Sequence, residues 1–185
     1  MKPLFSIFLF ALVTLAAYAC WAFGARLFGS PAALYTACTA VFLGLGSTTL
    51  YPLVSDRCSR LRFFGIYFGA FVGYAAFWCL LWSVFHNKQG EIFGSMIGLA
   101  AMSIIFRLGL GRPSNVITGA AILFLWHTFG YHLGELFHEQ FSHSHTTLAR
   151  LGWGLAHGIG FGTGLVSVLK KPDKLMTSPE KRVTD

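Results

Sequence analysis

The chain has 185 residues, of which 55% are hydrophobic and only 11% are charged. A soluble domain carries roughly 25% charged residues, and a disordered chain combines high charge with low hydrophobicity. The composition therefore excludes both classes and predicts an integral membrane protein. The formal net charge of +7 does not indicate a nucleic-acid partner, because the basic residues lie in the predicted loops and the tail, where they set membrane topology.

Six apolar segments follow one another along the chain, at about residues 4–24, 31–54, 63–85, 92–110, 115–136 and 148–169. A helix needs about 20 apolar residues to cross a bilayer, and backbone polar groups in lipid must be satisfied within the segment. We therefore predict an all-α fold, a polytopic integral membrane bundle of six transmembrane helices. It forms one domain over residues 1–169, followed by a basic, flexible cytoplasmic tail over residues 170–185.

The basic residues alternate between the predicted loops. With the N-terminus placed in the cytoplasm, all but three of the 14 Lys and Arg residues fall on the cytoplasmic side, the exceptions being Arg26, Lys88 and Arg150. Cytoplasmic loops carry an excess of Lys and Arg, so both termini are expected in the cytoplasm and the chain in the inner (plasma) membrane of a cell. The expected partner is the lipid bilayer, with other membrane subunits or a second copy as open alternatives.

The first segment also has features of a signal peptide, because Ala17 and Ala19 form a small-x-small pattern near its end. The apolar run continues through Cys20 and Trp21, which is long for such a peptide. We expect an uncleaved first helix.

Glycines recur at intervals of four in the last four segments. A spacing of four places small residues on one helix face and lets two helix backbones approach closely. We predict helix-packing contacts at these positions, and the alternative is that the glycine-rich last helix is mobile or faces a cofactor. The positions are Gly65, Gly69 and Gly73; Gly94 and Gly98; Gly130 and Gly134; and Gly154, Gly158 and Gly162.

A polar stretch rich in His and Glu begins at the end of the fifth segment and continues past it at the predicted outer side. Imidazole and carboxylate groups are ligands for zinc and other divalent ions. The pattern favours a solvated, pH-sensitive outer mouth, and a divalent metal site is the alternative. The residues are His132, Glu135, His138, Glu139, His143 and His145.

Two further histidines, His127 and His157, lie inside apolar segments. Each is about nine residues from the outer end of its segment, which is roughly 14 Å at 1.5 Å per residue and close to the middle of an about 30 Å hydrocarbon core. An ionisable group at that depth is a functional-site hypothesis by default. Three interpretations stay open: hydrogen bonding to a neighbouring helix, a solute or proton path, and ligation of a b-type haem or a metal.

No catalytic motif accompanies these residues, since the sequence contains neither a glycine-rich phosphate loop nor His-Glu-x-x-His. A role other than enzyme is therefore favoured. We expect a small-solute or ion transporter or channel, for a divalent metal or coupled to protons, with a histidine-rich outer mouth. The alternatives are a non-catalytic accessory or assembly subunit of a larger membrane complex and a haem- or metal-binding redox subunit.

Overall fold

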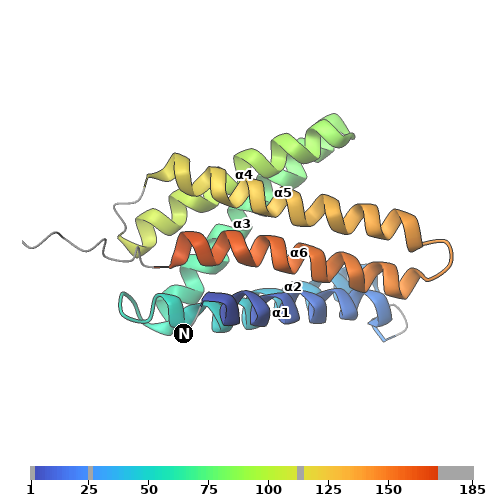
Figure 1. Ribbon diagram of the computed structural model, residues 1–185, viewed down its shortest axis with the longest axis horizontal. Coiled ribbons are helices and arrows are strands. Elements are labelled where there is room, and N and C mark those ends of the chain that lie inside the picture. Colours follow the sequence, from blue (N-terminus) through green and yellow to red (C-terminus); the bar gives the residue numbers. More distant parts are fainter. Residues whose placement is uncertain (1–2, 25–26, 112–114, 171–185) are drawn as a thin grey trace, which may run out of the picture.

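A computed structural model describes residues 3–24, 27–111 and 115–170 of the chain (Figure 1). These residues form helices and no strands, which confirms the predicted all-α fold for the part of the chain that is described. The predicted tail lies outside the described residues apart from Lys170. The elements are α1 (Pro3–Phe23), α2 (Pro31–Leu50), the 3-10 turn η2 (Tyr51–Leu53), α3 (Arg60–Phe85), α4 (Lys88–Leu110), α5 (Val116–Phe141) and α6 (Thr146–Leu169).

Side-chain caps determine where four of the helices begin. The side chains of Ser30, Ser59, Asn87 and Asn115 each accept a hydrogen bond from a backbone N–H in the first turn of the following helix, as Ser and Asn commonly do. The cap at Asn87 explains why α4 begins before the apolar run predicted from residue 92. At its other end α4 stops at Gly111, whose φ of 62° suits a residue without a Cβ.

Helix α5 extends five residues beyond the predicted end at residue 136. The ring of Phe137 fills the space beside Gly152 of α6, and the ring centroid of His138 lies 5.2 Å from that of Trp153. Because both side chains pack against α6, the helix continues to Phe141 and leaves a short turn before α6. The sequence alone placed these residues in a loop because they are more polar than the segment before them.

The chain is a helical membrane protein. Five helical segments, namely α1, α2 with η2, α3, α4 and α5, are long and apolar enough to cross a membrane. Helix α6 is also long, with 24 residues, but it contains Arg150, His157 and several glycines. It packs against both α1 and α5, so protein rather than lipid covers much of its surface, and a less apolar composition suffices.

The helices form a ring in which each contacts its neighbours in sequence and α6 closes back onto α1. Figure 1 shows α1, α5 and α6 running nearly side by side, with the α3–α4 pair inclined to them. The start of α1 and the end of α6 lie at the same end, which we call the termini end. The opposite end, with the turns after α1, α3 and α5, is the far end. Contacts between α2 and α3 are sparse, so this seam is the loosest part of the ring.

The packed core occupies mainly the termini half of the bundle. Phe63, near the start of α3, is buried together with Phe106 and Leu110 of α4 and Leu165 and Leu169 of α6. Side chains fill the far half less completely. The polar groups described below lie where the far half meets the middle of the bundle.

Candidate functional site

Two histidines from α5 and α6 meet in the middle of the bundle. His127 is 1% exposed, and its ring centroid lies 5.1 Å from that of His157 with the planes at 85°. The helices approach closely because Gly130 faces Gly160: a Cβ added to Gly130 would lie 2.7 Å from the carbonyl oxygen of Ala156 and 2.9 Å from Cα of Gly160. The two residues that the sequence placed at matched depth are therefore neighbours in space.

Each imidazole has a tyrosine partner on another helix. The Tyr74 hydroxyl of α3 lies 2.8 Å from Nε2 of His127, and the Tyr18 hydroxyl of α1 lies 3.3 Å from Nδ1 of His157. The other two ring nitrogens, Nδ1 of His127 and Nε2 of His157, are buried without a hydrogen-bond partner among the described residues. We call these four residues the His–Tyr cluster, and they join α1, α3, α5 and α6 through side chains.

The His–Tyr cluster does not fit a haem held between its two imidazoles. Two axial ligands bind a haem iron from opposite faces of the flat macrocycle, which separates their rings. Here the rings of His127 and His157 contact each other edge to face, and Tyr131 and Phe161 stack on them at interplanar angles of 11°. No space remains between the imidazoles for a porphyrin.

A cavity of about 630 Å³ adjoins the His–Tyr cluster in the far half of the bundle. Its innermost lining residues are Phe42, Leu43, Phe71 and Phe161, near the middle of their helices. Small-molecule pockets are typically about 300–1,000 Å³ and mainly apolar, so both size and lining suit a small ligand. The other lining residues are Ala17, Tyr18, Trp21, Tyr35, Cys38, Thr39, Val72, Tyr74, Ala75, Trp78, Cys79, Tyr131, Trp153 and His157.

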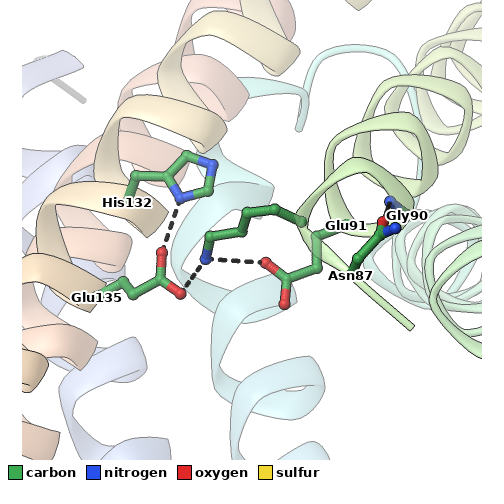
Figure 2. Close-up of polar contacts among 6 residues, drawn as sticks. Asn87, Gly90, Glu91, His132 and Glu135 are labelled. Atoms are coloured by element: carbon green, nitrogen blue, oxygen red, sulfur yellow. Dashed lines mark hydrogen bonds and ion pairs between the residues drawn. The ribbon is translucent and has the colours of Figure 1, made fainter. Parts of the chain in front are cut away.

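An ion-pair group joins α4 to α5 near the far end (Figure 2). Lys88 Nζ lies 3.2 Å from Glu91 Oε2 and also pairs with Glu135 Oε1, whose second oxygen lies 2.9 Å from Nδ1 of His132. Figure 2 shows His132 and Glu135 on one helix facing Glu91 on another. Of the residues predicted to bind metal, Glu135 thus pairs with Lys88, and His132 pairs with Glu135.

The other predicted metal ligands lie elsewhere. His138 packs between tryptophans, 5.2 Å from Trp153 and 6.3 Å from Trp21 between ring centroids. Glu139, His143 and His145 are exposed at the end of α5 and in the following turn. Within the described ranges, no three His, Cys, Asp or Glu side chains are grouped to hold a metal ion, so the geometry gives the metal interpretation no support.

The glycine positions divide into close contacts and open ones. Atoms of a facing helix lie within about 3 Å of an added Cβ at Gly94 and Gly98 between α3 and α4, at Gly130 and Gly134 between α5 and α6, and at Gly154, Gly158 and Gly162 between α6 and α1. Gly73 has a looser neighbour, Ile105 at 3.2 Å. Gly65 and Gly69 have nothing within 4 Å, so these two positions make no packing contact among the described residues.

Three residues of the site were missed by reasoning from sequence: Tyr18, Tyr74 and Trp153. Tyrosine and tryptophan are common at membrane interfaces, so none of the three attracts attention in an aromatic-rich chain. A usable signal exists for Tyr18 and Tyr74, because a phenol hydroxyl inside an apolar segment needs a hydrogen-bond partner in the bundle. His127 and His157 are ionisable partners at similar depth in the predicted helices.

The fold and the site together define a helical membrane protein with a buried polar cluster beside a mainly aromatic cavity. Comparisons with known protein families, with curated proteins and with solved structures find no match to this chain. The function is therefore argued from the geometry of the cavity and the His–Tyr cluster.

Proposed function

We propose that this protein is a transporter of the inner membrane that carries a small solute through the cavity beside the His–Tyr cluster. The observation that supports this proposal is the extent of the cavity. It occupies the far half of the bundle and reaches the level of His157, whereas packed side chains such as Phe63, Phe106 and Leu165 fill the termini half. Transporters bind solutes near the bilayer midplane and expose that site to one side at a time.

The distribution of charge supports cytoplasmic placement of the termini end. Among the described residues, Arg57, Arg60, Arg62 and Arg107 lie near that end, whereas Lys88 and Arg150 lie near the far end. An excess of basic residues marks the cytoplasmic side. In this orientation the cavity is accessible from the outside and closed toward the cytoplasm.

An uptake experiment tests the transport proposal. Proteoliposomes are incubated with a defined mixture of uncharged, anionic and cationic small organic solutes, washed, and their contents measured by mass spectrometry. We expect at least one solute to accumulate with the native protein and to fall to the level of protein-free vesicles with His157→Ala. The matched control is Trp126→Phe, because Trp126 is 41% exposed and does not line the cavity. Equal contents in vesicles with and without native protein contradict the proposal.

The open face of α3 favours a second candidate function, that of an accessory subunit. Gly65 and Gly69 have no neighbour within 4 Å, and Phe64 and Phe68 beside them are exposed. Small residues at this spacing promote helix association in membranes. Extraction in a mild detergent followed by mass measurement tests this candidate, and recovery only as a lone monomer contradicts it.

A further inference from the structure

We infer that the cavity binds an amphipathic acid, whose apolar body lies among the lining residues and whose anionic head, a carboxylate or a phosphate, binds Arg150 near the far end. The inference rests on the proposed function, in that it takes the cavity as the solute site. Three observations carry it: Arg150 has no anionic partner among the described residues, the ring of Trp21 joins its guanidinium to the cavity, and the lining residues are uncharged.

Arg150 is a cation without a counter-ion within the described part of the chain. Its side chain forms no hydrogen bond or ion pair there, and its guanidinium carbon Cζ lies 4.4 Å from the ring centroid of Trp21. Lys88, near the same end, differs because Glu91 and Glu135 neutralise it. An anion that approaches the far end is therefore attracted to Arg150 more than to Lys88.

The outer edge of the guanidinium is open to a ligand. Arg150 is partly exposed, and Nε is the guanidinium nitrogen that is buried without a partner. Nη1 and Nη2 are not closed off in this way, so they stay accessible. Their parallel N–H groups match the two oxygens of a carboxylate or a phosphate, and such charge-assisted pairs are roughly twice as strong as neutral hydrogen bonds.

Trp21 connects Arg150 to the cavity. It lies in the last turn of α1 and lines the cavity, and the guanidinium lies over its ring. Trp153, which also lines the cavity, is one helical turn from Arg150 on α6, and its ring centroid lies 6.3 Å from that of Trp21. We call Trp21 and Trp153 the rim. Since the guanidinium lies against the rim, one small molecule can reach from the cavity to Nη1 and Nη2.

The lining residues determine which part of the ligand lies inside. They include no Asp, Glu, Lys or Arg, and burying an ionised group without a partner is costly, so we expect the head outside, at Arg150. Tyr18, Trp78 and Tyr131 line the cavity beside the rim, and aromatic side chains provide large apolar contact areas. An uncharged body fits these walls. An amphipathic cation fits poorly, because Arg150 repels its head.

The binding experiment compares an acid with its neutral amide. The probes are 3-(2-naphthyl)propanoate and 3-(2-naphthyl)propanamide, which share the ring body and differ only in the head. Each is dialysed to equilibrium, near neutral pH and at low salt, against the purified protein in phosphatidylcholine nanodiscs, with empty nanodiscs as the partition blank. We expect saturable binding of the acid that is about tenfold or more tighter than that of the amide, since hydrogen bonds to a charged group contribute at this level. Equal affinities, or tighter binding of the amide, overturn the inference.

Variants of Arg150 test the site of the head. Arg150→Gln is expected to weaken binding of the acid about tenfold and to leave binding of the amide unchanged, which shows that the cavity is intact. Arg150→Lys keeps the charge without the fork and should retain part of the preference. Arg60→Gln is the matched control, because Arg60 also lies over an aromatic ring, 5.4 Å from the centroid of Tyr51, but near the termini end. Equal binding of the acid by native and Arg150→Gln protein overturns the inference.

A variant of the rim tests whether the body lies in the cavity. Trp21→Ala removes the ring beneath the guanidinium and part of the cavity wall, so binding of both probes should weaken several-fold. Trp126→Ala is the control, because Trp126 is 41% exposed and does not line the cavity. If Trp21→Ala changes binding of neither probe, the acid lies on the surface and the inference is overturned.

The head group of an anionic lipid offers the same chemistry as a free acid, so the titration is repeated in nanodiscs that contain phosphatidylglycerol. Binding of the acid in both kinds of nanodisc supports the inference. Retention of phosphatidylglycerol that depends on Arg150, measured by native mass spectrometry, without binding of the acid assigns Arg150 to membrane lipid and overturns it.

The outcome is distinguishable from that of the uptake experiment. Binding of the acid without uptake of any solute supports the ligand class and contradicts transport. Uptake of uncharged or cationic solutes without binding of the acid supports transport and overturns the ligand class.

Discussion

The hydrogen bond between Tyr74 and His127 is the best-buried polar contact of the site. Removing the hydroxyl in Tyr74→Phe leaves Nε2 of His127 without the partner that lies 2.8 Å away. An unsatisfied buried group costs about 1–3 kcal/mol, so we expect a lower midpoint of thermal unfolding in detergent. Tyr35→Phe is the matched control because Tyr35 is 59% exposed. Equal midpoints for the two variants would show that the contact does not stabilise the bundle.

The Cys58 thiol, which lies outside the membrane-spanning helices, is expected to react slowly. Burial raises its pKa above the ordinary value, against the smaller lowering effects of Arg62 and Arg57. The thiolate is the nucleophile, and a raised pKa means less thiolate at neutral pH. With the other cysteines replaced by serine, alkylation by N-ethylmaleimide at pH 7.5 should be several-fold slower than that of a cysteine at exposed position 55, where Ser55→Cys is combined with Cys58→Ser.

The pH dependence supplies the check on this prediction. The difference in rate should narrow as the pH rises toward and past the raised pKa, because both thiols are then ionised. A constant rate ratio at every pH would assign the slow reaction to restricted access instead of to the pKa.

Some residues of the site can be predicted from the sequence, and others cannot. His127 and His157 were found because ionisable groups are rare in apolar segments, and counting residues gave their depth. Tyr18 and Tyr74 were not found, because the direction in which each residue faces around its helix was unknown. The helices are apolar on nearly all sides, so the hydrophobic pattern does not identify the inward face as it does in a soluble protein.

At the scale of elements, the contact between α5 and α6 requires a glycine at position 130. The open face of α3 does not require one at position 69. In Gly130→Ala the new methyl group would lie 2.7 Å from the carbonyl oxygen of Ala156, and overpacking of this kind costs about 1–3 kcal/mol. In Gly69→Ala nothing lies within 4 Å, and alanine is favoured over glycine within a helix by about 1 kcal/mol. In mixed micelles, the free energy of unfolding should fall in Gly130→Ala and rise in Gly69→Ala. A similar loss of stability in both variants would indicate a partner on α3.

Helix positions were predictable from composition, but their ends were less so. Apolar runs and charged separators gave all six helices. The ends of α4 and α5 shifted because the Asn87 cap and the packing of Phe137 against α6 extend each helix into polar sequence. The Asn87 cap is local, to the N–H of Gly90, whereas the Phe137 contact is tertiary, because its two sides lie on different helices. The ion pair of Lys88 with Glu135, 47 residues apart, escaped prediction for the same reason.

For the whole molecule, the looseness of one seam in the ring explains where the cavities lie. Contacts between α2 and α3 are sparse, and a second hollow of about 500 Å³ lies along this seam beside Tyr35, Leu43, Phe64 and Phe68. α6, by contrast, is held on both sides by α1 and α5. Movement of the α3–α4 pair relative to α1 and α2 is therefore the change that would alter access to the His–Tyr cluster with the least loss of packing.

The orientation of the whole bundle can be tested with fused reporters in a bacterial membrane. Because the termini end carries most of the basic residues, we expect a green fluorescent protein joined to the C-terminus to fluoresce and an alkaline phosphatase joined there to stay inactive. A phosphatase fused after residue 143, in the turn between α5 and α6, should be active because this turn lies at the far end. The reverse pattern would place the cavity on the cytoplasmic side, and the proposed solute site would then open to the inside. Replacing Arg57, Arg60 and Arg62 by glutamine should weaken the preference for this orientation. These arginines lie in or beside the turn between α2 and α3, the most basic turn of the termini end.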